Sequence, residues 1–433
     1  MTMEGAVSGV MPARQPLTRV VLAATVGNVL EWFDFLIYGF FAVTIAEVFF
    51  PNNNPTVSLM VTFGTFGLAY IVRPLGAVFV GSYTDRHGRR AGLTLSIALM
   101  MIGTTIMVVT PGYAMIGVAA PILITIARLL QGFSVGGEFG SAVAFLAEHG
   151  SERKGFAASW QWATIGMISI IASLFGVILT TTLTHEQLVA WGWRIPYVFG
   201  LLVGPAGLYI RSRIPETPQY LAAKSSTMPL KSSTVPVGDL FRRQPIPLLL
   251  ALGAAVISNS SYYLLLYIPT YGVKTLHLPA STGFTATLVG GIILAIFSLV
   301  AGHWSDKSPR PRIMLITGWL FLLTSYPVFW LMVSYPSLAT AIFAVGWLNL
   351  VKAGYSGVLP SLMAEQFPVE TRAVGVALSF GISVTIFGGF APFVATWLIA
   401  VTNDPLSPSY YLMVTALLSI VALMFISRRK PVS

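Results

Sequence analysis

The sequence predicts an all-α membrane protein with twelve transmembrane helices in two six-helix bundles, and three observations predict this fold. Apolar residues make up 55% of the 433 residues and charged residues only 9%, against about 25% charged in soluble domains. The apolar residues gather into twelve stretches that can cross a bilayer, which takes about 20 residues. A short charged loop occurs once in each half of the chain, between two such stretches.

The apolar stretches fall into two sets of six on either side of a polar segment. The first set lies near 18–50, 56–83, 91–111, 114–147, 155–183 and 191–211. The second lies near 246–273, 279–304, 312–334, 336–366, 371–402 and 409–427. Prolines inside them are compatible with membrane helices, because neighbouring helices satisfy the freed backbone groups. The segment between the sets is rich in Pro, Ser and charge, and it predicts a linker with a short amphipathic helix near 236–243. The predicted domains are therefore an N-terminal bundle over 1–213, a linker over 214–244 and a C-terminal bundle over 245–433.

The positive charges predict the orientation in the membrane. With the N-terminus inside, 20 of the 25 Lys and Arg residues fall on one face, in loops, tails or the ends of spans, only Lys274 falls in an outer loop, and the other four lie deeper in spans. Because cytoplasmic loops collect Lys and Arg, both termini are predicted to be cytoplasmic. The same distribution accounts for the net charge of +10 without nucleic acid binding.

Several classes of site are excluded. The chain has no cysteine, so it holds no disulfide, thiolate metal site or cysteine nucleophile. No cleavable signal peptide is expected, since residues 1–17 form a polar tail before a long apolar stretch that carries acids. No catalytic nucleophile, metal cluster or cofactor loop stands out, so neither an enzyme nor a cofactor is expected.

The repeated loop predicts gating contacts. It reads Gly81-Ser-Tyr-Thr-Asp85-Arg86-His87-Gly88-Arg89-Arg90, and Gly302 begins a second copy 221 residues later. Gly81 would permit close backbone approach, and Asp85 would face a helix N-terminus, where the helix dipole favours an anion. The arginines of the loop would add ion pairs in one access state. The second copy keeps Asp306 and Arg310 but lacks the Gly-Arg-Arg ending, so the contact is expected to be stronger in the N-terminal half. Such a pair of loops indicates a duplicated transport protein.

Acids within the first span predict proton coupling. Ionisable residues at membrane depth are costly and are functional candidates. Glu31 and Asp34 lie three residues apart and so share a helix face. Two carboxylates this close cannot both be ionised cheaply in a low-dielectric site, so one would hold a proton. The alternative is a structural ion pair with Arg73 or Arg128. Glu138 lies nearer the cytoplasmic end of its span. It would carry the proton, form part of a gate, or pack against a neighbouring helix.

Two cations in the spans predict substrate contact. Arg128 and Lys352 lie about 21–24 Å along the fourth and tenth spans at 1.5 Å per residue, near the midplane where carriers place their sites. Arg128 would either bind an anion or neutralise an acid of the first span. Lys352 has no acid within a helical turn, so a substrate carboxylate would supply its counter-charge, with snorkelling as the alternative. The three deep cations, which include Arg73, balance the three deep acids, so protonating one acid would favour entry of an anion.

Polar side chains in otherwise apolar spans are candidates for the wall of a substrate cavity. Their alternative role is hydrogen bonding between helices. They are Tyr38, Gln131, Gln161, Asn259, Tyr262, Tyr267 and Tyr355.

The motifs resemble those of major facilitator superfamily transporters, and within that group the metabolite–proton symporters. The carrying strings are GNVLEWFDFLIYG (27–39), RPLGAVFVGSYTDRHGRR (73–90), RLLQGFSVGGE (128–138), GWRIPY (192–197), PETP (215–218) and FGGFAP (387–392). The segments 267–272 and about 353–412 are most similar to citrate and tricarballylate carriers.

The resemblance implies alternating access between two six-helix bundles and cotransport of a small metabolite with protons. We therefore expect a monomeric symporter in the lipid bilayer of a bacterial inner membrane, importing a small organic di- or tricarboxylate. The alternatives are a symporter of a zwitterionic osmolyte, a drug-efflux antiporter, and a membrane sensor without transport. The last would need an output domain that the chain does not show.

Overall fold

The computed structural model describes residues 32–87, 89–135, 153–212, 237–368 and 371–429. Within these ranges every regular element is helical. In the described part of the chain, eight helices are long and apolar enough to cross a membrane, and a bent pair of helices gives a ninth. The remaining predicted spans correspond to the helices α5, α7 and α11. The protein is thus an all-α membrane protein with the predicted order of helices.

The N-terminal spans begin with a bent pair of helices, Trp32–Phe40 and α2 (Ala42–Phe49), which meet at 73°. The span predicted over 18–50 is therefore bent in its described part, a feature that the sequence did not predict. The other elements of this half are α3 (Pro55–Ile71), α4 (Arg73–His87), α5 (Arg89–Val109), α6 (Tyr113–Ile116), α7 (Ala119–Ser134), α9 (Lys154–Thr182), α10 (His185–Ala190), η1 (Gly192–Arg194) and α11 (Ile195–Ser212).

The C-terminal spans follow a short helix, α13 (Val237–Arg243), at the position predicted for an amphipathic helix. Three of these spans are each divided between two or three segments. The elements are α14 (Pro245–Leu266), α15 (Ile268–Lys274), α16 (Ala280–Ser305), α17 (Arg310–Ser334), α18 (Leu338–Ser356), α19 (Leu359–Glu365), α20 (Arg372–Ser383), the π-helix η2 (Val384–Gly389), α21 (Ala391–Thr402) and α22 (Ser407–Ser427).

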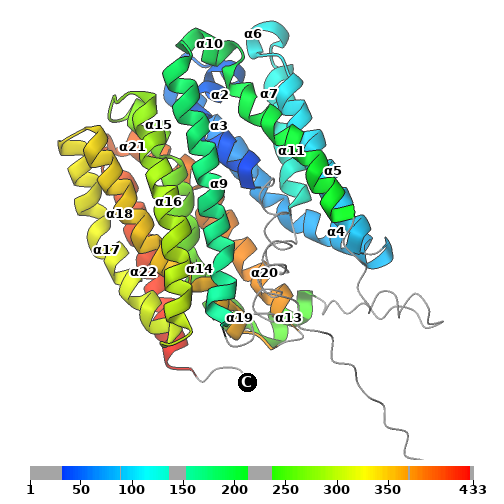
Figure 1. The fold of residues 1–433 in the computed structure, drawn as a ribbon, viewed down its shortest axis with the longest axis vertical. Coiled ribbons are helices and arrows are strands. Elements are labelled where there is room, and N and C mark those ends of the chain that lie inside the picture. Colours follow the sequence, from blue (N-terminus) through cyan, green and yellow to red (C-terminus); the bar gives the residue numbers. More distant parts are fainter. Residues whose placement is uncertain (1–31, 88, 136–152, 213–236, 369–370, 430–433) are drawn as a thin grey trace, which may run out of the picture.

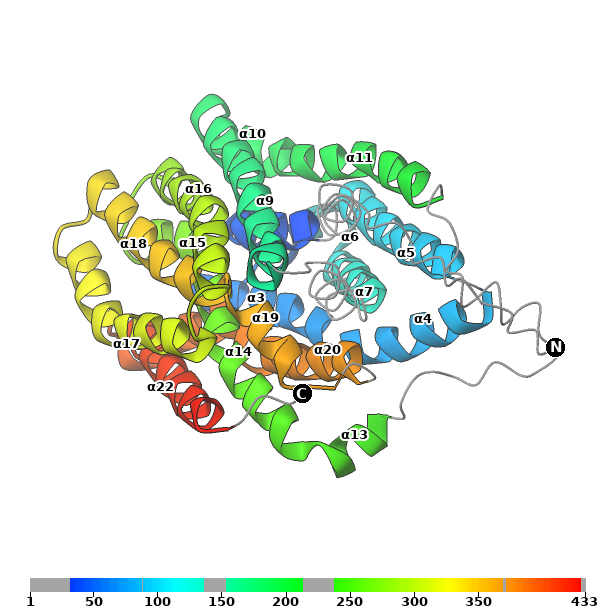
Figure 2. The same ribbon diagram turned by 60° about the horizontal axis from the view of Figure 1, so that its bottom comes forward.

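The longest contact between the two halves runs along α9 and α16, which lie side by side (Figure 1; Figure 2). Their backbones approach at glycines. A Cβ on Gly166 would stand 2.6 Å from the backbone nitrogen of Ala295, and one on Gly302 would stand 2.8 Å from the carbonyl oxygen of Gly155. Small residues permit this packing in membranes, where van der Waals contact drives helix association.

A second contact between the halves joins α3 to the segment formed by η2 and α21. The ring of Phe390 lies against Gly67, where a Cβ would stand 2.6 Å from it, and the ring of Tyr70 lies against Gly389. The hydroxyl of Thr385 donates a hydrogen bond to the carbonyl oxygen of Tyr70 at 3.1 Å. A π-helix inside an α-helix is often found at functional sites, and this one brings two aromatic rings onto glycine backbone.

Candidate functional site

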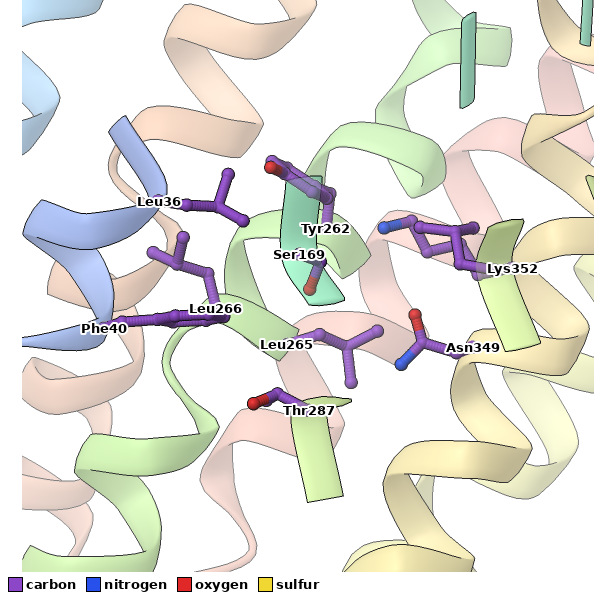
Figure 3. A pocket seen from close by; sticks show the side chains of 10 residues that line it. Leu36, Phe40, Ser169, Tyr262, Leu265, Leu266, Thr287, Asn349 and Lys352 are labelled. Carbon is purple, nitrogen blue, oxygen red and sulfur yellow. The ribbon is translucent and has the colours of Figure 1, made fainter. Parts of the chain in front are cut away.

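A small cavity lies between the two halves (Figure 3). Its wall includes residues from the helix Trp32–Phe40 and α9 of the first half and from α14, α16 and α18 of the second. Four leucines and Phe40 make half of this wall. The polar side chains in it are Ser169, Tyr262, Thr287, Asn349 and Lys352. An apolar cavity with a few convergent polar groups is the usual form of a small-molecule site.

Lys352 is the charged residue of this wall. Its side chain is 1% exposed, and Figure 3 shows its ammonium pointing from α18 toward Tyr262. The Nζ atom lies 4.3 Å from the ring centre of Tyr262 and 5.0 Å from that of Trp162. None of the described residues forms a salt bridge with it. Asn349, one turn earlier on the same face, donates its Nδ2 to the carbonyl oxygen of Val345 at 2.9 Å.

Tyr262 stands at the centre of an aromatic cluster. Its ring meets Trp32 at 5.7 Å, Trp162 at 5.8 Å and Tyr263 at 4.9 Å, each nearly perpendicular. The hydroxyls of Tyr262 and Tyr263 and the Nε1 of Trp162 are buried and make no hydrogen bond to the described residues. Buried polar groups without partners are costly, so the hydroxyl of Tyr262, which belongs to the wall of the cavity, is available to a ligand.

A separate polar network surrounds Asp34 in the N-terminal half. Its carboxylate accepts hydrogen bonds from the hydroxyl of Thr104 and, at 3.3 Å, from the Nε2 of Gln131. Gln131 also donates to Thr104 at 3.1 Å and accepts from the Nη1 of Arg128 at 2.8 Å. Asp34, Gln131 and Arg128 are all buried. Asp34 and Arg128 are thus connected through Gln131, and the direct ion pair given above as the alternative is not among the salt bridges of the described residues.

Arg128 is enclosed by aromatic rings. Its guanidinium carbon lies 4.3 Å from the ring centre of Phe35, 4.5 Å from that of Tyr38 and 5.2 Å from that of Phe66. Arg128 does not line the cavity that contains Lys352. Both cations were predicted to contact the substrate, and this geometry places only Lys352 of the two in the wall of the cavity.

Arg73 lies on the opposite flank of the same aromatic group. Its guanidinium carbon is 4.1 Å from the ring centre of Tyr70, 4.8 Å from that of Phe35 and 5.7 Å from that of Trp32. The Nε and Nη2 atoms of Arg73 make no hydrogen bond to the described residues. Phe35 thus contacts both buried arginines, and Trp32 connects Arg73 to Tyr262.

The second copy of the repeated loop makes a contact between the halves. The carboxylate of Asp306 accepts hydrogen bonds from the backbone N–H groups of Gly155 at 2.6 Å and Phe156 at 3.0 Å, at the start of α9. Arg310 joins Asp306, at 3.4 Å, to Glu365. The copy that lacks the full motif therefore builds the predicted arrangement of acid, helix N-terminus and arginine.

The first copy is described only in part. Asp85 and Arg86 lie in α4, and Arg89 and Arg90 begin α5. No described atom lies within 4 Å of the position that a Cβ on Gly81 would take, so the close approach expected there is not seen. Three further predicted residues lie outside the described ranges, namely Glu31, Gly88 and Glu138.

Most of the other polar residues predicted to line the cavity contact neighbouring helices instead. The hydroxyl of Tyr38 donates to the carbonyl oxygen of Thr62 at 3.2 Å, and that of Tyr355 donates to Ala254 at 2.7 Å. Asn259 donates to Ser383 at 3.1 Å. These three serve packing between helices, as does Tyr267, whose ring lies 5.5 Å from that of Phe63. Gln161 is buried with both amide atoms unbonded to the described residues.

The sequence reasoning missed Trp162, Asn349, Thr287 and Ser169. A signal existed for Asn349, since a residue three positions before Lys352 shares its helix face. No such signal marks Trp162, because aromatic residues are frequent throughout the spans. Among the described residues, no three acids or histidines gather in a way that could hold a metal ion.

Comparisons with known proteins give a consistent picture. The sequence profile of the Major Facilitator Superfamily matches residues 24–347. A citrate-proton symporter of Klebsiella pneumoniae is 35% identical over 423 residues, which covers 95% of this chain and 92% of the relative. A proline/betaine transporter of Escherichia coli K12 is 34% identical over 416 residues, which covers 94% of this chain and 82% of the relative. The crystal structure of a D-xylose-proton symporter has a TM-score of 0.73 at 18% identity, covering 96% and 98% of the two chains.

Proposed function

This chain belongs to the major facilitator superfamily, and from that premise we propose that it is a proton-coupled symporter that imports a small organic di- or tricarboxylate by alternating access. The relatives are named as transporters rather than enzymes. The protein would act as a monomer in a bacterial inner membrane, with both termini in the cytoplasm. The division into bundles over 1–213 and 245–433, joined by a linker over 214–244, belongs to the same proposal.

One observation carries the choice of an anionic substrate, namely the buried ammonium of Lys352 in the wall of the cavity. An ionised group inside a membrane protein needs a counter-charge, and none of the described residues supplies one to Lys352. A substrate carboxylate would supply it. The hydroxyl of Tyr262 would donate a second hydrogen bond to the same ligand.

Proton coupling is assigned to Asp34. Gln131 hydrogen-bonds both the carboxylate of Asp34 and the guanidinium of Arg128. Protonation of Asp34 would therefore leave the positive charge of Arg128 uncompensated in the N-terminal half. Arg73, with buried donors and ring contact to Trp32, would then add to the positive potential around the cavity. The potential favours entry of an anion, and loss of the proton favours its release.

The experiment is a thermal-shift screen of the purified protein against about twenty carboxylates and zwitterions, since a ligand of the folded state raises its apparent stability. The best di- or tricarboxylate is then tested on Lys352→Ala, with Lys274→Ala as the matched control at an exposed position. We expect Lys352→Ala to lose about 2–5 kcal/mol of binding free energy and Lys274→Ala to bind normally. Unchanged affinity in Lys352→Ala would remove Lys352 as a ligand residue.

A zwitterionic osmolyte is the second candidate substrate, because relatives named as proline/betaine transporters are 33–34% identical to this chain. Stabilisation by glycine betaine or proline in the same screen, with uptake that rises with external osmolality, would favour this candidate over a polycarboxylate.

A further inference from the structure

We infer that Trp162 and Tyr262 form a binding site for a cation and that the protein fills this site with its own Lys352, so that it rejects substrates that carry a quaternary ammonium group. This inference rests on the proposed function, since it assumes that the cavity beside Lys352 receives the substrate. It adds the basis on which an anion is distinguished from a zwitterion.

The geometry of the two rings defines the site. Trp162 on α9 and Tyr262 on α14 belong to different halves, and their planes meet at 75° with centroids 5.8 Å apart. The ammonium of Lys352 lies within 5.0 Å of both ring centres. A cation within about 6 Å of a ring centre is attracted by the negative face of the ring, and tryptophan gives the strongest attraction. We call this arrangement the Trp162–Tyr262 corner.

The corner is preformed rather than assembled by the lysine. Trp162 is 1% exposed and Tyr262 is 5% exposed. Tyr262 is held from two further sides by Trp32 and Tyr263, at 5.7 Å and 4.9 Å. Removing the lysine side chain would therefore leave both rings in place, with their faces turned to the vacated space.

The contact with the two rings leaves the N–H donors of the Lys352 ammonium free. The rings attract the charge without forming hydrogen bonds to it, and none of the described residues accepts a hydrogen bond from Nζ. Its N–H donors therefore remain for a carboxylate in the cavity. A trimethylammonium group has no N–H and would need the space and the rings that Lys352 occupies, and its charge would be repelled by the lysine.

The first test uses the wild-type protein and two ligands of the same shape. Glycine betaine and 3,3-dimethylbutanoate each carry a carboxylate, but the first has a trimethylammonium group where the second has a neutral tert-butyl group. Affinities are measured from ligand-induced thermal shifts or from the competition of each ligand with tricarballylate. We expect the neutral isostere to bind at least about tenfold more tightly. Equal or tighter binding of glycine betaine would overturn the inference.

The second test removes the lysine. Lys352→Ala opens the corner, and we expect it to reverse the order, so that glycine betaine binds about tenfold more tightly than its isostere. Lys352→Met is the matched variant, because its unbranched side chain removes the charge but still fills the space. Lys352→Met should gain no affinity for glycine betaine. In the Lys352→Ala background, Trp162→Leu should abolish the gain.

The outcomes separate this inference from the proposed function. If no di- or tricarboxylate binds the wild-type protein, the proposed function fails, while the preference between the two isosteres still tests the corner. If polycarboxylates bind through Lys352 but folded Lys352→Ala prefers the neutral isostere, the proposed function stands and the corner is not a cation site.

Discussion

The side-chain amide of Gln131 donates a hydrogen bond to the carboxylate of Asp34 at 3.3 Å. The same amide accepts one from Arg128 at 2.8 Å, so the buried acid reaches the buried base through a neutral side chain. A direct ion pair with Arg128 would strongly stabilise the ionised form of Asp34. The indirect contact, together with burial, leaves the acid able to exchange its proton within a transport cycle.

Asp34→Asn is expected to abolish uphill uptake driven by a pH gradient while substrate counterflow continues, because the amide keeps the shape of the carboxylate but cannot carry the proton. The measurement is substrate accumulation in proteoliposomes with and without a gradient. Glu47→Gln is the control, since Glu47 is an exposed acid that contacts His185 at 3.2 Å. Accumulation at the wild-type level in Asp34→Asn would mean that another acid carries the proton.

Asp306→Asn is expected to weaken the contact between the second loop copy and α9, because it removes a charge from a helix N-terminus, worth about 0.3–1 kcal/mol. The protein has no cysteine, so a buried Ser159→Cys can report opening beside Gly302 through maleimide labelling. Labelling should be faster with Asp306→Asn than without it.

Asp404→Asn provides a matched comparison for this labelling. Asp404 accepts a hydrogen bond from the backbone N–H of Leu406 at 2.8 Å, just before α22, and none of its hydrogen bonds to described residues reaches the N-terminal half. It should leave the labelling rate of Ser159→Cys unchanged. Equal rates in all three proteins would argue against a role for Asp306 in closure.

Gly166→Ala is expected to destabilise the protein by about 1–3 kcal/mol, because its Cβ would stand 2.6 Å from the backbone of Ala295. Gly381→Ala is the matched change, since nothing described lies within 4 Å of its Cβ position. An alanine there should stabilise α20 by up to about 1 kcal/mol through helix propensity. The measurement is thermal unfolding in detergent, and opposite shifts are expected. A neutral Gly166→Ala would mean that α9 and α16 are not in backbone contact.

Tyr262→Phe is expected to weaken carboxylate binding severalfold with little effect on stability, because its buried hydroxyl bonds none of the described residues. Tyr355→Phe should lower stability and leave carboxylate binding unchanged. Its hydroxyl donates to Ala254 at 2.7 Å, so its loss should cost about 1 kcal/mol of stability and leave affinity unchanged. Affinity and unfolding midpoint are measured on both variants, and equal loss of affinity would contradict the assignment of Tyr262 to the cavity.

Hydropathy predicted the helices well, because a chain in lipid must satisfy its backbone groups within helices. The span predicted over 155–183 is α9, Lys154–Thr182, and that over 279–304 is α16, Ala280–Ser305. Breaks within spans were not predicted. The bend after Phe40 and the interruption at Tyr267 depend on packing against neighbouring helices, which one sequence does not reveal.

The site was predicted only in part, because the sequence gives the position of a residue along a helix but not the direction of its side chain. Depth along a helix can be counted from residues, and this count singled out Lys352, which is buried in the structure. The direction in which a side chain points around the helix axis cannot be counted when a helix is apolar on every side. Arg128 shows this, because it points toward Phe35, Tyr38 and Phe66 instead of the cavity. The role of Trp162 requires its ring to be seen beside Lys352.

The glycine contacts between α9 and α16 bear on the rate of the transport cycle. At Gly166 the backbone of α9 meets the backbone of Ala295, and Gly302 of α16 meets the backbone of Gly155 and the small side chain of Ser159. No large side chain lies in these two contacts, so turning one bundle against the other requires few rotamer changes there. These two contacts would add little to the activation barrier between access states. The barrier would arise where rings and charges must separate, at Phe390 against Gly67 and at Asp306 against α9. Substitutions at those two places should change turnover more than equilibrium affinity.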